Sequence, residues 1–285
     1  HVNKYLISPD GNKWIEAITN TGTIFGIPVI PKKSLYIGNS LLVGFSYGMA
    51  ASDDEHDYYY YMTKTSGGCN SKLSGVIFEA QTEQSGVDEW LNTKLLPMLN
   101  DDLDFVSIQL GDNVNTEAKQ KLFKSYSCAK LIQFIHSNAP KARVSWTGSW
   151  YEGYLKTTYK KACEDNNATF IDITDIHDAY LYASHLGAIY KTELKTTTYE
   201  VESFELDTTN KIATLHFNAN SKAYTSKVPY EDFASDAGIH ATITGYWEVI
   251  TSAGIASHPG DEGMLKIANR MAYTLGWINN DGDIK

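Results

Sequence analysis

The chain has 285 residues, 42% of them hydrophobic and 20% charged, a composition typical of a globular protein long enough to bury a substantial core. Its formal net charge of −10 argues against a nucleic-acid partner, which requires a basic face. No apolar run reaches the roughly 20 residues needed to span a bilayer, so we expect no membrane span. Three scattered cysteines show neither metal spacing nor a disulfide framework and are predicted to be free thiols: Cys69, Cys128 and Cys163.

Residues 1–30 contain short β-like pieces separated by turn signals, and we expect a leader or the tail of a preceding β module. From residue 31 onward, short apolar runs alternate with stretches whose apolar residues have helical spacing. The predicted strands are 34–38, 72–80, 103–111, 142–148 and 168–174. The predicted helices are 40–64 (with a break at 52–57), 87–100, 116–138, 154–166 and 261–277.

This alternation of strands and helices predicts βαβ units and a parallel sheet covered on both faces. Residues 189–250 depart from it, because polar residues there alternate with β-branched and aromatic ones, as in antiparallel strands. We therefore predict an α/β domain formed by residues 31–188 and 251–285, with a β-rich insertion at 189–250.

Polar residues that could carry chemistry lie at the ends of the predicted strands, where ligands bind in open parallel sheets. Ser40 follows the first strand in "IGNS", residues 109–115 follow the third, and residues 256–264 precede the last helix. Taken alone, Ser40 is either a helix N-cap or an activated nucleophile, since both roles suit a serine at a strand-to-helix turn.

Three short motifs carry a resemblance to the SGNH (GDSL-like) hydrolase family. Gly38-Asn39-Ser40 is similar to its first block, with GNS in place of the commoner GDS, and Gly111-Asp112-Asn113 is similar to its third. His258-Pro259 is similar to its last block, where the catalytic histidine is followed by proline and a helix. The resemblance covers roughly residues 30–188 and 251–278, and it depends on the three motifs occurring in order at strand ends.

The resemblance implies a flavodoxin-like three-layer α/β sandwich with a central parallel sheet of about five strands. It also implies a serine esterase with Ser40 as nucleophile and His258 as the base that takes its proton. The oxyanion hole would consist of the Ser40 backbone N–H, a glycine N–H from the second block and the Asn113 side-chain amide. We assign that glycine to Gly75, with Gly68 as the alternative.

One position departs from the family pattern. An aspartate that orients the histidine usually lies three residues before it, and here that position is Ile255. Asp261 and Glu262 suit the first turn of the last helix better, and Asp236 lies near His240 within the insertion. We expect a Ser–His dyad whose histidine is oriented by a backbone carbonyl or by an acid from elsewhere, or else reduced activity.

Two acidic clusters, 52–61 and 172–180, match no metal-ligand pattern and are interpreted as solvated loops or helix N-cap clusters, so we expect neither metal nor cofactor. Trp150 and Tyr151 follow the fourth predicted strand, and we expect them at the rim of the site, where aromatic faces can stack on sugar rings. The alternative is that Trp146 and Trp150 are core residues.

The predicted activity is hydrolysis of small acyl esters, acetyl in particular, on a glycan or another small ester substrate. A lipid-acyl esterase or thioesterase is the alternative enzyme. The alternative class is a catalytically weak carbohydrate-binding surface or phage-type protein on the same fold. We expect an extracellular, periplasmic or surface location, and no apolar signal segment is present at His1. Oligomeric state is left open.

Overall fold

The computed structural model describes residues 30–44, 48–151, 155–178, 184–191, 197–230 and 247–278, together with short strands at 6–7, 15–16, 23–24, 27–28, 234–235, 238–239 and 242–245. The strands described before residue 30 are each two residues long and form two antiparallel pairs. They are β1 (Leu6–Ile7) with β2 (Ile15–Glu16) and β3 (Thr23–Ile24) with β4 (Ile27–Pro28).

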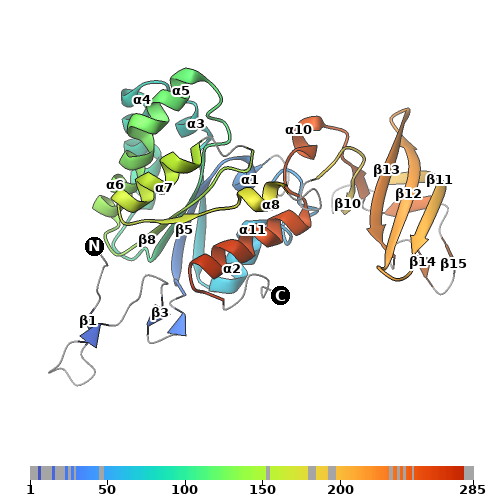
Figure 1. The fold of residues 1–285 in the computed structure, drawn as a ribbon, viewed down its shortest axis with the longest axis horizontal. Helices are drawn as coiled ribbons and strands as arrows, with labels where there is room; N and C mark the ends of the chain where they lie inside the picture. The colour runs from blue at the N-terminus through green and yellow to red at the C-terminus, as the bar shows by residue number, and fades with distance from the viewer. Residues whose placement is uncertain are drawn as a thin grey trace.

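A five-stranded, fully parallel sheet forms the centre of the α/β part, as the sequence predicts (Figure 1). Its order is β6-β5-β7-β8-β9, so the chain adds one strand on one side of β5 and the remaining three on the other. The carboxyl ends of β5 and β7 therefore flank the point where the winding reverses, and ligands bind at such points. The strands are β5 (Lys33–Gly38), β6 (Cys69–Ser74), β7 (Phe105–Gln109), β8 (Arg143–Thr147) and β9 (Thr169–Ile171).

Helices cover both faces of this sheet (Figure 1). On one face lie α3 (Val76–Glu79), α4 (Gln84–Trp90), α5 (Glu117–Leu122), α6 (Cys128–Asn138) and α7 (Lys156–Asp165), with the π-helical turns Leu91–Leu95 and Phe123–Ser127 and the 3₁₀ turn Leu96–Met98 between them. On the other lie α1 (Ser40–Val43), α2 (Tyr58–Ser66), α8 (Thr174–Asp178) and α11 (Asp261–Thr274).

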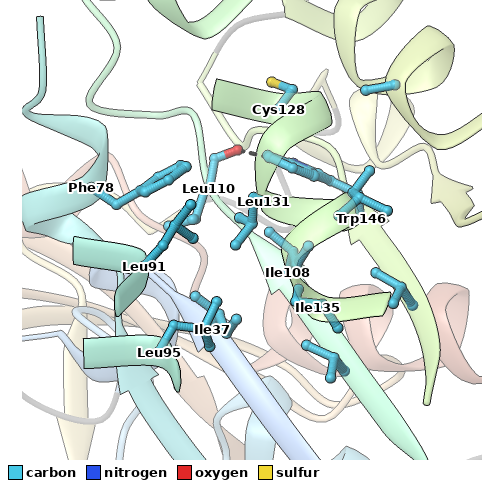
Figure 2. Close-up of a cluster of buried hydrophobic side chains, with 14 of the residues drawn as sticks. Ile37, Phe78, Leu91, Leu95, Ile108, Leu110, Cys128, Leu131, Ile135 and Trp146 are labelled. Atoms are coloured by element: carbon cyan, nitrogen blue, oxygen red, sulfur yellow. Dashed lines mark hydrogen bonds between the residues drawn. The ribbon is translucent and has the colours of Figure 1, made fainter. Parts of the chain in front are cut away.

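The alternation of side chains along the strands separates the core into two clusters. Leu35 and Ile37 of β5 belong to the cluster under α4, α6 and α7, whereas Tyr36 between them belongs to the cluster under α2 and α11. Figure 2 shows the first cluster, with strand and helix side chains packed together: Ile37, Ile108 and Trp146 from the sheet, and Leu91, Leu95, Leu131 and Ile135 from the helices. Each such side chain, fully buried, contributes about 1.5–3 kcal/mol.

Two predicted boundaries are wrong. The strand predicted at 72–80 ends at Ser74, because Gly75 starts the short helix α3, which turns Phe78 and Glu79 inward while Ile77 stays exposed. The break predicted at 52–57 within the helical region 40–64 is confirmed, since α2 starts at Tyr58, but the first helix is shorter than predicted because α1 ends at Val43. Gly44, with a φ of +26°, follows α1, and Asp57 caps the start of α2 by accepting a hydrogen bond from the Tyr60 N–H at 2.6 Å.

Residues 197–245 contribute a four-stranded antiparallel sheet in the order β13-β12-β11-β16, which lies to one side of the α/β part (Figure 1). Its own apolar cluster includes Ala213, Leu215 and Phe217. The four strands are β11 (Thr197–Asp207), β12 (Ile212–Ala219), β13 (Lys222–Pro229) and β16 (Thr242–Gly245). Two further antiparallel pairs are β10 (Ile189–Lys191) with β17 (Trp247–Val249), and β14 (Ala234–Ser235) with β15 (Gly238–Ile239). The antiparallel strands predicted for 189–250 are therefore present.

Candidate active site

Ser40 lies at the sharp turn between β5 and α1. Gly38 ends the strand, and a Cβ added there would come within 2.5 Å of the Leu42 Cβ, so this close turn requires glycine. Asn39 is the N-cap of α1, and its Oδ1 accepts a hydrogen bond from the Leu41 N–H at 3.2 Å. Ser40 is thus the first helical residue rather than the cap, and its N–H lies at the positive end of the helix, without a carbonyl one turn earlier to bond.

The structure brings Ser40 and His258 together although 218 positions separate them in the chain. The Ser40 Oγ lies 2.8 Å from the His258 Nε2. His258 occupies the turn between α10 (Ala253–Ala256) and α11, and its Nδ1 lies 2.6 Å from the Gly254 carbonyl oxygen. A carbonyl only accepts, so Nδ1 carries the proton and the Nε2 lone pair faces the serine hydroxyl.

The Gly254 carbonyl therefore occupies the place where an orienting aspartate would act. Ile255, at the family's aspartate position, packs against an apolar cluster that includes Ile250 and Ala256. Asp261 accepts hydrogen bonds from the backbone N–H and the hydroxyl of Ser52, both at 2.7 Å, and lies in the first turn of α11. Asp236 and His240 lie outside the described residues. Of the two orienting groups considered from the sequence, the backbone carbonyl is the one that the described part of the chain places within hydrogen-bond distance of the His258 Nδ1.

Burial lowers the pKa of His258 below its usual 6.5, while the hydrogen bond to Gly254 and the charge of Asp112 act in the opposite direction. The imidazole is therefore neutral, and able to accept a proton, at neutral pH.

Tyr151 lies against the histidine ring rather than at an outer rim. Its hydroxyl is 2.6 Å from Nδ1 and 2.9 Å from Nε2 of His258, and the two rings meet edge to face. Its backbone N–H donates to the Asp112 Oδ1 at 3.0 Å, which fixes the chain at this point. Burial raises the pKa of Tyr151 to about 12, so its hydroxyl stays protonated.

The rim position predicted for Trp150 is wrong. Its side chain is 1% exposed and packs in the cluster under α11, and its indole N–H donates to the Ser257 carbonyl at 3.0 Å. The hydrogen bond to Ser257 helps to hold the turn that contains His258. Because the indole is buried, it cannot present a ring face to a sugar. Trp146 is likewise a core residue.

The glycine predicted for the oxyanion hole is not free to act as a donor. The Gly75 N–H donates to the Gly38 carbonyl at 2.8 Å, which extends the β5–β6 ladder by one bond. Gly68 lies at the opposite end of β6, where an added Cβ would come within 2.1 Å of the Lys32 carbonyl oxygen. The two predicted donors that remain at the carboxyl end of the sheet are the Ser40 N–H and the Asn113 amide.

Asn113 belongs to the loop after β7, and it joins a polar network that the sequence does not reveal. Its Nδ2 donates to the Glu79 Oε2 at 2.6 Å. Asn39 uses both hydrogens of its amide, to Glu79 Oε1 at 3.2 Å and to Asp112 Oδ2 at 2.9 Å. The only sequence signal for Glu79 is a single acid within the apolar run "VIFEA", which a buried strand or helix face would not normally contain.

The two acidic clusters dismissed from the sequence pair with nearby groups. Asp53 contacts His56, and the Asp175 carboxylate accepts two hydrogen bonds from Arg270, at 2.9 and 2.8 Å. Among the described residues, no group of three or more His, Cys, Asp or Glu side chains is placed to hold a metal ion. Nor does any helix in the described part of the chain combine the length and apolarity that crossing a bilayer requires.

No protein-family model matches the chain, and no curated protein matches it. Among solved structures, it is similar to phospholipase A1 from Streptomyces albidoflavus NA297, with 15% identity over 52% of this chain and 82% of that one and a TM-score of 0.37. It is also similar to an acetyl xylan esterase from the rumen bacterium Butyrivibrio proteoclasticus, with 15% identity over 51% and 56% and a TM-score of 0.35. A third is described as a GDSL-like lipase from Bacteroides uniformis ATCC 8492, with 15% identity over 51% and 84% and a TM-score of 0.37. At these identities and TM-scores, the assignment of the site depends on its own geometry.

Proposed function

We propose that this protein is a serine ester hydrolase of the SGNH kind that removes small acyl groups, acetyl in particular, from a carbohydrate. The observation that carries the proposal is the line of contacts from the Ser40 Oγ to the His258 Nε2 at 2.8 Å and from the His258 Nδ1 to the Gly254 carbonyl at 2.6 Å. This arrangement holds a neutral imidazole in the tautomer that can deprotonate the serine.

The reaction follows from these positions. As the Ser40 oxygen attacks the ester carbonyl, His258 takes the hydroxyl proton, and it returns that proton to the alcohol that leaves. Water then attacks the acyl-enzyme carbonyl while His258 takes its proton. The bond to the Ser40 oxygen breaks, the carboxylic acid is released, and His258 returns the proton to Ser40. Negative charge on the tetrahedral oxygen is stabilised by the Ser40 N–H and the Asn113 amide, each worth about 3–4 kcal/mol of the barrier.

The alternative of a binding protein without catalysis is weakened by the same geometry. Its main support in the sequence is the missing aspartate before His258, and the Gly254 carbonyl supplies an acceptor that holds the same tautomer of the ring, although without the charge of a carboxylate. The preference for a short acyl group and a sugar is supported by the half-buried Tyr151 ring, whose hydroxyl lies beside the catalytic pair, and by the acidic composition. A longer acyl chain remains the second candidate, and the assay below distinguishes the two.

The direct test is hydrolysis of p-nitrophenyl acetate by the protein and by Ser40→Ala. We expect the variant to lose at least about 10³-fold in kcat, because the nucleophile is removed. Ser137→Ala is the matched control, since Ser137 is an exposed serine on α6 whose hydroxyl donates to the Gln133 carbonyl of the same helix. Absence of hydrolysis in the unmodified protein would reject the enzyme, and full activity in Ser40→Ala would reject Ser40 as nucleophile.

The acyl preference is measured in the same assay with acetyl, butyryl and octanoyl esters, followed by acetylated xylo-oligosaccharides. A decline in kcat/KM with acyl length, together with acetate release from the oligosaccharide, is the expected result. The reverse order would favour the lipid-acyl alternative.

A further inference from the structure

Glu79 lies directly behind the candidate site and holds its loops together. It ends α3 and is 0% exposed, yet it faces three hydrogen-bond donors from elements far away in the chain. Its Oε1 accepts from the Asn39 amide at 3.2 Å and from the Gly111 N–H, and its Oε2 accepts from the Asn113 Nδ2 at 2.6 Å. Each of these three donors lies within two residues of a group that the proposed reaction uses, or is that group itself.

The ionised state of Glu79 determines which way the Asn113 amide faces. A carboxylate only accepts, so the NH₂ end of the amide must face it. One hydrogen of Nδ2 is then bound to Glu79, and the second hydrogen on the same nitrogen is left to bind an oxyanion. We propose that Glu79 is the positioning residue that keeps Asn113 as an oxyanion donor, and that a proton on Glu79 turns the amide over and removes this donor.

The location of the added proton follows from the contacts. A proton on Oε1 would face two donors, Asn39 and Gly111, whereas a proton on Oε2 faces only Asn113. The proton therefore goes to Oε2, where the new O–H faces the NH₂ group of Asn113. The Asn113 amide relieves this contact between two donors by rotating so that its oxygen faces the protonated Oε2. That rotation places an oxygen lone pair where the hydrogen-bond donor was, so the oxyanion loses a donor and gains a repulsive neighbour.

The surroundings of Glu79 place this protonation in the neutral pH range. Burial, the largest effect, together with the charge of Asp112, raises the pKa of Glu79 to about 7, although the hydrogen bonds from Asn113, Gly111 and Asn39 lower it. In the described part of the chain, Tyr159 on α7 also interacts electrostatically with Glu79, and Lys119 on α5 donates from its Nζ to the Asn113 carbonyl at 3.2 Å. Because the pKa of His258 lies below 6.5, Glu79 gains its proton first as the pH falls.

The inference rests on the proposed esterase function, and Glu79→Gln tests it. Glutamine presents an N–H at one end of its amide, as the protonated acid presents an O–H, and it cannot ionise. At about pH 8 we expect kcat for p-nitrophenyl acetate to fall about 10²–10³-fold, as for Asn113→Ala, with a much smaller change in KM. The double variant Glu79→Gln/Asn113→Ala should lose no more kcat than either single variant, because both substitutions remove the same oxyanion donor.

The pH profile separates positioning from a merely structural role. Between about pH 5 and pH 9 the unmodified protein should lose kcat as the pH falls through about 7, whereas Glu79→Gln should show only the later loss due to His258. Glu83 is an exposed acid four residues after Glu79, and Glu83→Gln should show the same pH profile of kcat as the unmodified protein. Wild-type kcat in Glu79→Gln, or an unchanged acid limb in that variant, would overturn the inference.

A second measurement does not depend on catalysis. The side-chain amide signals of Asn113, followed by nitrogen-15 NMR in the folded protein, should shift with a midpoint near pH 7. They should not shift at this midpoint in Glu79→Gln. A flat Asn113 titration in the unmodified protein overturns the inference even if the esterase is active. Conversely, a clear titration in a protein without esterase activity supports the positioning role while the proposed function fails. Should Glu79→Gln not fold, the titration of the unmodified protein decides alone.

Discussion

At the scale of single residues, the amide at position 39 fits its surroundings in a way that the commoner aspartate of this motif would not. The Asn39 side chain donates to two carboxylates, Glu79 and Asp112, and its oxygen accepts from the Leu41 N–H. An aspartate would keep the contact with Leu41 but would have no hydrogens for the two acids. The GNS sequence is therefore matched to the buried Glu79 in this chain.

Asn39→Asp should accordingly destabilise the fold. Two donors are lost, and a third negative charge is placed beside the buried Glu79 and the partly buried Asp112, so we expect a loss of about 3 kcal/mol in the free energy of unfolding at pH 8. The loss should be smaller at pH 5, where protonation relieves the repulsion. Urea unfolding at both pH values measures it. Asn115→Asp is the control, because Asn115 is exposed and its oxygen faces Lys119. Equal stability of the two variants would contradict this account of Asn39.

At the scale of elements, the loop from β7 to α5 depends on one glycine. Gly111 has a φ of +132°, and a Cβ added there would lie 1.6 Å from the hydroxyl oxygen of Tyr159, a buried residue of α7. Its N–H also donates to Glu79. The conformation of Gly111 therefore sets where Asn113, two residues later, enters the site.

We expect Gly111→Ala to lower the free energy of unfolding by about 3 kcal/mol, from backbone strain and from the displaced Tyr159, and to lower kcat by displacing Asn113. Gly67→Ala provides a comparison, since Gly67 also has a positive φ (+64°) but nothing within 4 Å of an added Cβ. It should cost only about 1 kcal/mol and leave kcat unchanged. Thermal or urea unfolding together with the ester assay checks both variants. The account of this loop fails if both glycines tolerate alanine equally.

At the scale of the whole molecule, the late antiparallel sheet and the α/β part have separate apolar clusters but are joined close to the site. The Gly187 N–H donates to the Ile250 carbonyl at 2.8 Å, and the Ile250 N–H donates to the Ala188 carbonyl at 2.9 Å. The Ser184 N–H also donates to the His258 carbonyl at 3.0 Å. The chain thus leaves for the antiparallel strands and returns from them at adjacent points, and the returning segment leads directly to the turn that holds His258.

The free energy of unfolding of the whole protein should depend on pH because of the buried Glu79. Its pKa is raised from 4.5 to about 7 on folding, so the folded state binds the proton more tightly, and stability is lost as the pH rises through this range. The shift corresponds to about 3 kcal/mol. Urea unfolding at about pH 4.5 and pH 8 measures this effect. Between these two pH values, the free energy of unfolding of the unmodified protein should fall by about 3 kcal/mol more than that of Glu79→Gln. A difference between the two proteins that does not change with pH would contradict the raised pKa.

The fold and the location of the site could be predicted from local pattern. Apolar runs such as 103–111, each followed by an amphipathic helix, determine a parallel sheet, and its geometry brings polar residues at strand ends to one edge. Strand-end position singled out Ser40 and the segments 109–115 and 256–264, and the resemblance to the SGNH motifs selected Asn113 and His258 within those segments. The structure places Ser40 and His258 in hydrogen-bond contact. Their catalytic roles remain proposals.

Only the tertiary structure decided what surrounds these residues. The carbonyl of Gly254 as the partner of His258, the Gly75 N–H engaged by Gly38, and Glu79 beneath Asn113 are all outcomes of packing. Periodicity determines which face of an element is buried, but these contacts join groups whose relative positions depend on strand register, on the turns that follow each strand and on how two loops meet. A hydrogen bond between positions 79 and 113 has no counterpart in the local sequence of either, so it could be found only once the sheet had brought them together.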